Sequence, residues 1–117
     1  MREIKFRAWD KSFKKMTEWE DMRQRGINQF FNADWALLMQ YTGLKDKHGK
    51  EIYEGDRVYT GGLDCVVEWE ENECRFILRR PGKQTIPQTT PLDKMHSPQF
   101  EVIGNIWENK ESIEVSK

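Results

Sequence analysis

Alternation of apolar and polar side chains runs through most of the chain and predicts strands. Apolar residues alternate with charged ones over residues 3–9, with the period of two that is typical of a half-buried strand. Turn-forming residues follow at 10–12, so residues 15–19 are expected to return as the second strand of a hairpin. The same pattern predicts strands over residues 35–41 and 100–108, the first with apolar side chains on both faces. It therefore favours a mainly β protein.

The central part of the chain is divided by two turns. Residues 45–50 are charged and contain a glycine, which favours a turn with a positive φ angle. A second turn is expected at residues 54–56, between the apolar pair at 52–53 and a strand over residues 57–60. These short, closely spaced elements are typical of a small antiparallel sheet.

Residues 63–79 contain the clearest hairpin pattern. If residues 70–73 form a four-residue loop, apolar side chains meet on one face and opposite charges meet on the other. A slip by one residue would mix the two sets, which favours this register. The expected cross-strand pairs are Trp69–Cys74, Val67–Phe76, Cys65–Leu78 and Leu63–Arg80 on the apolar face, and Glu68–Arg75, Val66–Ile77 and Asp64–Arg79 on the charged face.

Two segments have no clear period. Residues 20–34 combine loop-forming and apolar residues and are assigned to neither helix nor strand. Residues 81–98 are expected to be mostly loop, with at most one short edge strand, because proline lacks the N–H that a sheet requires. The length of this segment makes it a candidate functional loop. The prolines of the chain are Pro81, Pro87, Pro91 and Pro98.

Together these elements predict a mainly β, antiparallel fold. Residues 1–44 are expected to form an N-terminal β-hairpin region with a further strand. Residues 45–108 are expected to form a small bent sheet or SH3-like β-barrel, and residues 109–117 a polar tail. Because neither half has many apolar residues of its own, the two are expected to share a core and to fold as one unit.

Composition and charge exclude several classes of protein. The 117 residues include five Trp, six Phe and three Tyr, which argues against disorder. With 19 basic and 20 acidic residues, the chain is neither a polycation nor an acidic tail protein. Its apolar runs are shorter than the roughly 20 residues of a membrane span. The charged residues 1–15 do not resemble a signal peptide, so a cytoplasmic location and no membrane partner are expected.

The cysteines and histidines do not form a metal-binding pattern. Cys65 and Cys74 are too few for a disulfide framework and are expected to be reduced, mostly buried thiols that do not bond to each other. His48 and His96 lie far apart in different contexts. A structural zinc ion needs about four ligands, usually in close pairs. We therefore expect no metal and no cofactor.

Catalytic patterns are likewise missing from the sequence. No pair of carboxylates has the apolar surroundings that would raise a pKa for acid–base catalysis. The glutamates of residues 70–73 are interpreted as a solvated loop tip, and residues 46–49 as a charged turn rather than a calcium loop. Nucleophile motifs and phosphate-binding glycine loops are also missing. The chain is therefore expected not to be an enzyme.

A basic cluster at the end of the predicted hairpin is the one candidate contact site. Arg79, Arg80 and Lys83 follow a strand and continue into the proline-containing loop. With an exposed aromatic ring nearby, they could bind nucleic acid through phosphate pairing and base stacking. The alternative is an ordinary solvated group of charges, since the net charge of −1 gives no overall attraction to nucleic acid.

Three blocks of residues carry a family resemblance. They read MREIKFRAWD at residues 1–10, MQYTGLKDKHGKEIYEGD at residues 39–56 and FEVIGNIWEN at residues 100–109. In this order the chain strongly resembles the YopX family of small phage and prophage proteins. The resemblance implies a β-rich fold and a bacterial cytoplasmic setting, and it implies no catalytic residue. Residues 53–58, followed by the hairpin, look like the entry to an SH3-like barrel.

These observations lead to one main functional hypothesis and one alternative. The main hypothesis is a non-enzymatic phage or prophage accessory protein that acts through protein–protein contacts, with itself or with a phage or host protein. Exposed aromatic side chains and open strand edges favour a homo-oligomer with an aromatic-lined contact surface. The alternative is a nucleic-acid-binding module that uses Arg79, Arg80 and Lys83.

Overall fold

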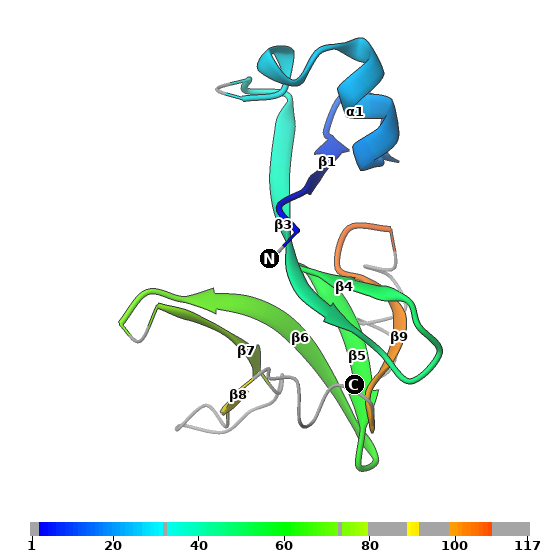
Figure 1. Ribbon diagram of the computed structural model, residues 1–117, viewed down its shortest axis with the longest axis vertical. Helices are drawn as coiled ribbons and strands as arrows, with labels where there is room; N and C mark the ends of the chain where they lie inside the picture. Colours follow the sequence, from blue (N-terminus) through cyan, green and yellow to red (C-terminus); the bar gives the residue numbers. More distant parts are fainter. Residues whose placement is uncertain (1–2, 32, 73, 80–88, 92–98, 109–117) are drawn as a thin grey trace.

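The protein consists mainly of antiparallel strands arranged in two sheets (Figure 1). The structure, a computed structural model, describes residues 3–31, 33–72, 74–79, 89–91 and 99–108. Its elements are β1 (Phe6–Asp10), β2 (Lys15–Thr17), α1 (Trp19–Arg25), η1 (Ile27–Gln29), β3 (Ala36–Lys45), β4 (Glu51–Tyr53), β5 (Asp56–Thr60), β6 (Leu63–Glu70), β7 (Arg75–Arg79), β8 (Thr89–Pro91) and β9 (Glu101–Asn105).

The strands are divided between the two sheets. The first sheet has the strand order β2-β1-β3-β4, and the second has the order β8-β7-β6-β5-β9. The second sheet curls strongly along β6 and is called the half-barrel below (Figure 1). The predicted mainly β, antiparallel fold with a small bent sheet in the C-terminal half is thereby confirmed. The short edge strand expected within residues 81–98 is β8.

The first sheet is covered on one face by α1, which the sequence pattern did not predict. Trp19 and Met22 are one helical turn apart, and Met22 is fully buried against Ala8 and Phe30. Acidic residues in the first turn and basic residues in the last turn suit the helix dipole. Gly26, with a φ angle of 99°, follows the last residue of the helix. The strand expected over residues 15–19 is accordingly shorter and ends before α1.

The opposite face of the first sheet meets the half-barrel. Alternation along β1 directs Phe6 and Ala8 toward α1 and leaves Arg7 and Trp9 on the other face. Trp9 is stacked with Trp107, which follows β9, and the ring centroids are 6.4 Å apart. The buried Trp9 and the half-buried Trp107 thus pack against each other between the two sheets.

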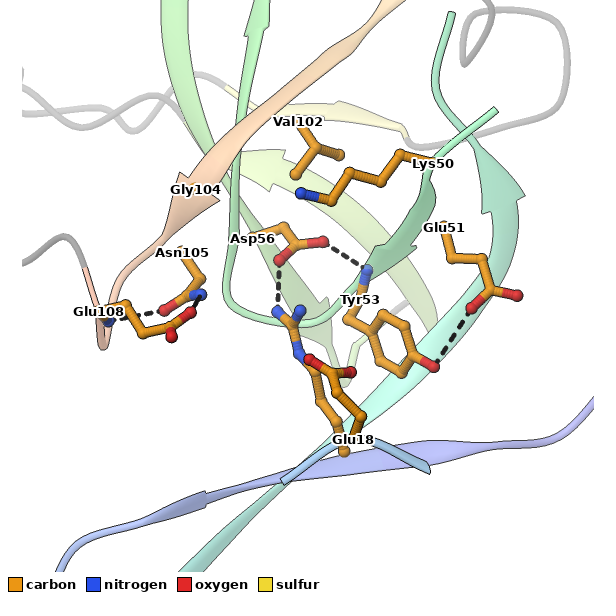
Figure 2. Close-up of a pocket in the computed structure, with 10 residues that line it drawn as sticks. Glu18, Lys50, Glu51, Tyr53, Asp56, Val102, Gly104, Asn105 and Glu108 are labelled. Carbon is orange, nitrogen blue, oxygen red and sulfur yellow. Dashed lines mark hydrogen bonds and ion pairs between the residues drawn. The ribbon is translucent and has the colours of Figure 1, made fainter. Parts of the chain in front are cut away.

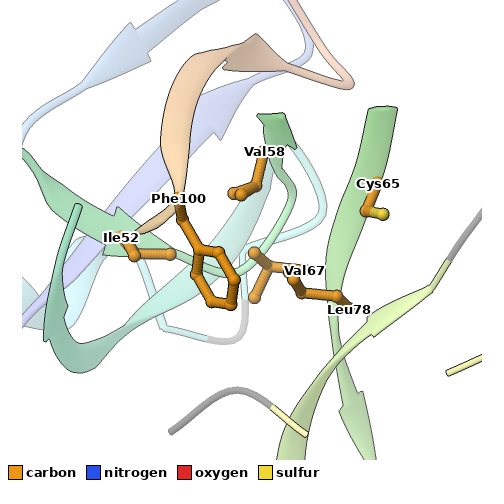
Figure 3. Packing of buried hydrophobic residues seen from close by; sticks show 6 residues of the cluster. All are labelled: Ile52, Val58, Cys65, Val67, Leu78 and Phe100. Atoms are coloured by element: carbon orange, nitrogen blue, oxygen red, sulfur yellow. The ribbon is translucent and has the colours of Figure 1, made fainter. Parts of the chain in front are cut away.

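The half-barrel has its own buried core. Figure 3 shows its six buried side chains grouped inside the curled sheet. They are Ile52, Val58, Cys65, Val67, Leu78 and Phe100. The turn between β3 and β4 closes the half-barrel against β9, because the Lys47 backbone N–H donates to the Phe100 carbonyl over 2.9 Å.

Asp46 organises that turn. One carboxylate oxygen accepts the backbone N–H groups of His48 and Lys50, and the other accepts that of Val102 over 2.9 Å. Burial acts to raise the pKa of Asp46, but the three N–H donors outweigh it and hold the pKa below its ordinary value. The charged turn predicted at residues 45–50 is therefore present, and Gly49 has the expected positive φ angle of 81°.

The predicted register of the β6–β7 hairpin is wrong by two residues. Val67 lies opposite Leu78, and Trp69 lies opposite Phe76, so the predicted pairs within the described residues are displaced by two positions. The predicted pair Leu63–Arg80 includes a residue outside the described part of the chain. The loop still has four residues, but it comprises residues 71–74, and Cys74 adopts a left-handed φ angle of 50°. A shift by two leaves strand side chains on their predicted faces. The apolar face is therefore correct for Cys65, Val67, Phe76 and Leu78, but Cys74 belongs to the loop and is exposed.

The ion pairs of the hairpin also differ from the predicted ones. Glu70 pairs with Arg75 over 3.1 Å, Glu68 pairs with Arg79 over 2.6 Å, and Asp64 pairs with Arg57 on β5. None of these is a pair that the predicted register contained. Opposite charges nevertheless meet on this face. Glu70 lies directly opposite Arg75, whereas Glu68 reaches diagonally to Arg79, which lies opposite Val66.

Two glycines in tight turns allow a matched test of packing between the sheets. Gly55 has a φ angle of 82°, and a Cβ atom there would lie 3.2 Å from Met39 Sδ and 3.5 Å from Trp107 Nε1. Gly49 has a φ angle of 81° and no atom within 4 Å of such a Cβ position. Gly49→Ala should cost about 1–2 kcal/mol through backbone strain alone. Gly55→Ala should cost about 1 kcal/mol more, because Met39 and Trp107 must move. Urea denaturation measures the free energy of unfolding of both variants. Equal losses would show that Met39 and Trp107 move without a measurable cost.

Candidate functional site

A polar pocket lies where the first sheet meets the half-barrel (Figure 2). It has a volume of about 260 Å³. Its lining comes from β1, β4, β5 and β9 and from the segments beside β2 and after β9. The lining residues are Arg7, Glu18, Lys50, Glu51, Tyr53, Asp56, Val102, Gly104, Asn105 and Glu108.

A buried ion pair between Arg7 and Asp56 forms one wall of this pocket. Arg7 Nη2 donates to Asp56 Oδ1, and the two side chains are only 8% and 1% exposed. The second carboxylate oxygen accepts the Tyr53 backbone N–H over 2.8 Å, across the turn that joins β4 to β5. The Arg7 guanidinium also lies 4.7 Å from the centroid of the Tyr53 ring. A charge on β1 is thus held directly by the start of the half-barrel.

Burial shifts the ionisation of two groups in the pocket. It raises the pKa of Asp56, while Arg7 and the Tyr53 N–H act in the opposite direction. The sequence expectation concerned pairs of carboxylates and did not single out Asp56, whose partner is Arg7. Burial also raises the pKa of Tyr53 to about 12, so its phenol remains protonated at neutral pH.

Two other carboxylates of the pocket, those of Glu51 and Glu108, also bind partners within the protein. Glu51 pairs with Lys5 and accepts the Tyr53 hydroxyl at 3.5 Å. Glu108 accepts the Asn105 side-chain amide over 2.6 Å, and the Asn105 carbonyl oxygen accepts two backbone N–H groups of the turn after β9. Among the described residues of the lining there is no Ser, Cys, Thr or His that could act as a nucleophile or as an imidazole base. The ion pair and hydrogen bonds of Arg7, Asp56 and Tyr53 join the two sheets.

The described residues contain no group of three or more His, Cys, Asp or Glu side chains placed to hold a metal ion. Cys65 is buried in the half-barrel core, whereas Cys74 is exposed, which corrects the prediction that both are mostly buried. No disulfide joins the two cysteines, as expected. His48 is exposed and lies 3.7 Å from Glu101, and His96 is outside the described residues.

The predicted basic cluster is only partly within the described residues. Arg79 is the last residue of β7, and its Nε atom donates to Glu68 Oε1 over 2.6 Å. This ion pair reduces the positive charge available to a phosphate. Arg80 and Lys83 lie outside the described residues, so nucleic-acid contact by these three residues stays a prediction.

Exposed aromatic side chains at two hairpin ends are a feature that the sequence pattern did not locate. Phe13, in the turn between β1 and β2, is 78% exposed. Trp69, at the end of β6, is 44% exposed and lies edge-on to Phe76 with a centroid distance of 5.0 Å. The sequence signal for both was an aromatic residue beside a charged turn, which does not by itself separate a buried ring from an exposed one.

Comparison with known proteins places the chain in a family. A family model described as YopX protein matches residues 24–114. The chain belongs to the YopX family. The resemblance carried by its three sequence blocks is thereby confirmed, and no curated protein matches the chain.

A solved structure shares the fold of this YopX-family chain. It is the crystal structure of protein EF1440 from Enterococcus faecalis, with a TM-score of 0.53 and 23% sequence identity. The match covers 97% of this chain and 99% of that chain. At this identity the similarity concerns the fold alone. Within the described part of the chain, no helix is both long and apolar enough to cross a membrane.

Proposed function

We propose that this YopX-family protein is a non-enzymatic phage or prophage accessory protein that acts through contacts with other proteins in the bacterial cytoplasm. The observation that carries the proposal is the exposure of large aromatic side chains at two hairpin ends, Phe13 on one and Trp69 on the other. Aromatic side chains that protrude into solvent are frequent anchors of protein interfaces, because they bury a large area when they dock.

The polar pocket supports the same proposal indirectly. Its ion pair and hydrogen bonds engage Arg7, Asp56 and Glu51 with other parts of the same chain. A catalytic group must instead have a free atom within reach of a substrate. The pocket therefore accounts for the junction between the sheets, and the hairpin ends remain as the surfaces available to a partner.

Affinity capture tests the proposal directly. Tagged protein is purified from lysogenic or infected bacteria, and half of each sample is treated with nuclease. We expect a co-purifying protein that survives the nuclease and is lost when Phe13 and Trp69 are both replaced by Ala. Tyr59→Ala is the matched control, because Tyr59 is 46% exposed but lies within β5 rather than at a hairpin end.

Other outcomes would contradict the proposal. Partners that disappear with nuclease would favour nucleic-acid binding, the alternative based on Arg79, Arg80 and Lys83. Capture of no protein, or equal loss of partners in the Tyr59→Ala control, would show that the hairpin ends are not the contact surface.

A further inference from the structure

Residues 11–15, which are the turn between β1 and β2 and the first residue of β2, carry three lysines and no acidic residue. Lys11, Lys14 and Lys15 are exposed, and none of them takes part in an ion pair among the described residues. Phe13 stands between them and is 78% exposed, more than any other large hydrophobic side chain of the described residues. We call residues 11–15 the basic turn.

The basic turn is held in a defined conformation. The carboxylate of Asp10 accepts the backbone N–H groups of Ser12 over 2.9 Å and Phe13 over 3.0 Å. The Lys11 backbone N–H donates to the Trp35 carbonyl over 2.8 Å. Asp10 itself is only 5% exposed, so its negative charge faces the backbone rather than the solvent. A preorganised turn loses little conformational entropy when its side chains dock.

The end of the β6–β7 hairpin, residues 69–76, has the opposite charge. By sequence it contains three glutamates and one arginine, and one of the glutamates, Glu73, is outside the described residues. Arg75 is already paired with Glu70. Glu71 is exposed and has no ion pair among the described residues. Trp69 and Phe76 face each other at this end and continue the apolar face of the hairpin beyond the half-barrel core. We call residues 69–76 the acidic end.

We infer that copies of this chain associate head to tail, with the basic turn of one copy docked against the acidic end of the next. Phe13 would pack on the Trp69–Phe76 pair, and the lysines would face the glutamates. One contact then accounts for the exposed aromatic side chains at both ends. Figure 1 shows β1 and the β6–β7 hairpin end on different sides of the molecule, so each copy can contact two others. Such heterologous contacts generate rings or filaments.

This inference deepens the proposed function by naming a second copy of the chain as a partner. Its electrostatic part is sensitive to salt, because exposed charges are screened by ions. Association of the wild-type protein should therefore be stronger in low salt than in high salt. Light scattering and sedimentation at several protein concentrations measure this dependence.

Reversal of the charges at each end, in two separate variants, is the decisive experiment. One variant carries Lys11→Glu, Lys14→Glu and Lys15→Glu, and the other carries Glu71→Lys and Glu73→Lys. Each variant alone should associate at least about tenfold more weakly than the wild type, because like charges would face each other. An equimolar mixture should associate again, because the reversed turn of one variant meets the reversed end of the other.

A further variant distinguishes specific docking of the two ends from a general attraction between oppositely charged proteins. Adding Phe13→Ala to the lysine-reversed variant leaves all charges unchanged but removes the ring. Association of this mixture should be clearly weaker than that of the mixture that retains Phe13. Equal association in both mixtures would show a non-specific attraction and would overturn the inference.

Three further results would also overturn it. The first is a wild type that is monomeric at every concentration. The second is association of both reversed variants as strong as that of the wild type. The third is binding of a single-stranded oligonucleotide to the basic turn that is lost on lysine reversal, with no self-association. A monomeric wild type would leave the proposed function open, because a foreign protein partner would still be found by affinity capture.

Discussion

Replacement of Asp56 by Ala is expected to lower the free energy of unfolding by about 3–5 kcal/mol. Asp56 is 1% exposed and supplies the carboxylate that holds Arg7. Removal of one partner leaves the other charge buried without compensation, which is far more costly than the loss of a surface ion pair. The Nε atom of Arg7 has no hydrogen-bond partner among the described residues, so the guanidinium depends strongly on Asp56.

A double variant provides the control for this prediction. In Arg7→Met with Asp56→Leu, both charges are replaced by apolar side chains of similar length. Such exchanges of buried ion pairs are often neutral or stabilising, so the double variant should be much more stable than Asp56→Ala. Urea denaturation of the three proteins completes the comparison. A loss below about 1 kcal/mol for Asp56→Ala would show that the pair behaves as a solvated one.

Replacement of Phe30 by Ala should have an effect of similar size on the other side of the first sheet. Phe30 is 1% exposed and packs edge-on against Trp35 with a centroid distance of 5.4 Å. It shares a buried cluster with Ala8 and Met22. Truncation of a buried Phe leaves a cavity and typically costs about 3–5 kcal/mol. Because α1 is only seven residues long, it depends on this cluster and should lose helicity when the cluster is weakened.

The same substitution at Phe13 is the matched control. Phe13 is 78% exposed, so Phe13→Ala should change the free energy of unfolding by less than about 0.5 kcal/mol. Thermal denaturation followed by circular dichroism and tryptophan fluorescence compares the two variants. Similar losses at Phe30 and Phe13 would contradict the packing described for the first sheet.

Local patterns predicted most of the strands and the family. Alternation along residues 3–9 places Phe6 and Ala8 on one face of β1, and the structure confirms this. The strand is not half-buried, however, because Arg7 and Trp9 on the other face are buried as well. The charged turn with Gly49 and the short strand β8 were also expected, because glycine and proline act on the backbone of their own segment. These features depend on neighbouring residues and can therefore be inferred without tertiary structure.

Other features could not be inferred in this way. The β6–β7 register was predicted two residues out because a shift by two preserves the faces of both strands. The actual pairing depends on the left-handed conformation of Cys74, a residue type that gives no signal for it. Helix α1 was missed because a short helix with few apolar residues is stabilised by the cluster it covers rather than by its own propensity.

The sequence by itself determined that the chain is a mainly β member of the YopX family, since strand periodicity, turn residues and family blocks are all local. Only the tertiary structure decided that Arg7 and Asp56, 49 residues apart, form a buried pair between the two sheets. It also decided that Phe13 and Trp69 are exposed while Phe30 is buried. Solvent exposure and desolvation depend on which segments pack together, and a pattern within one segment carries no information about the segment that covers it.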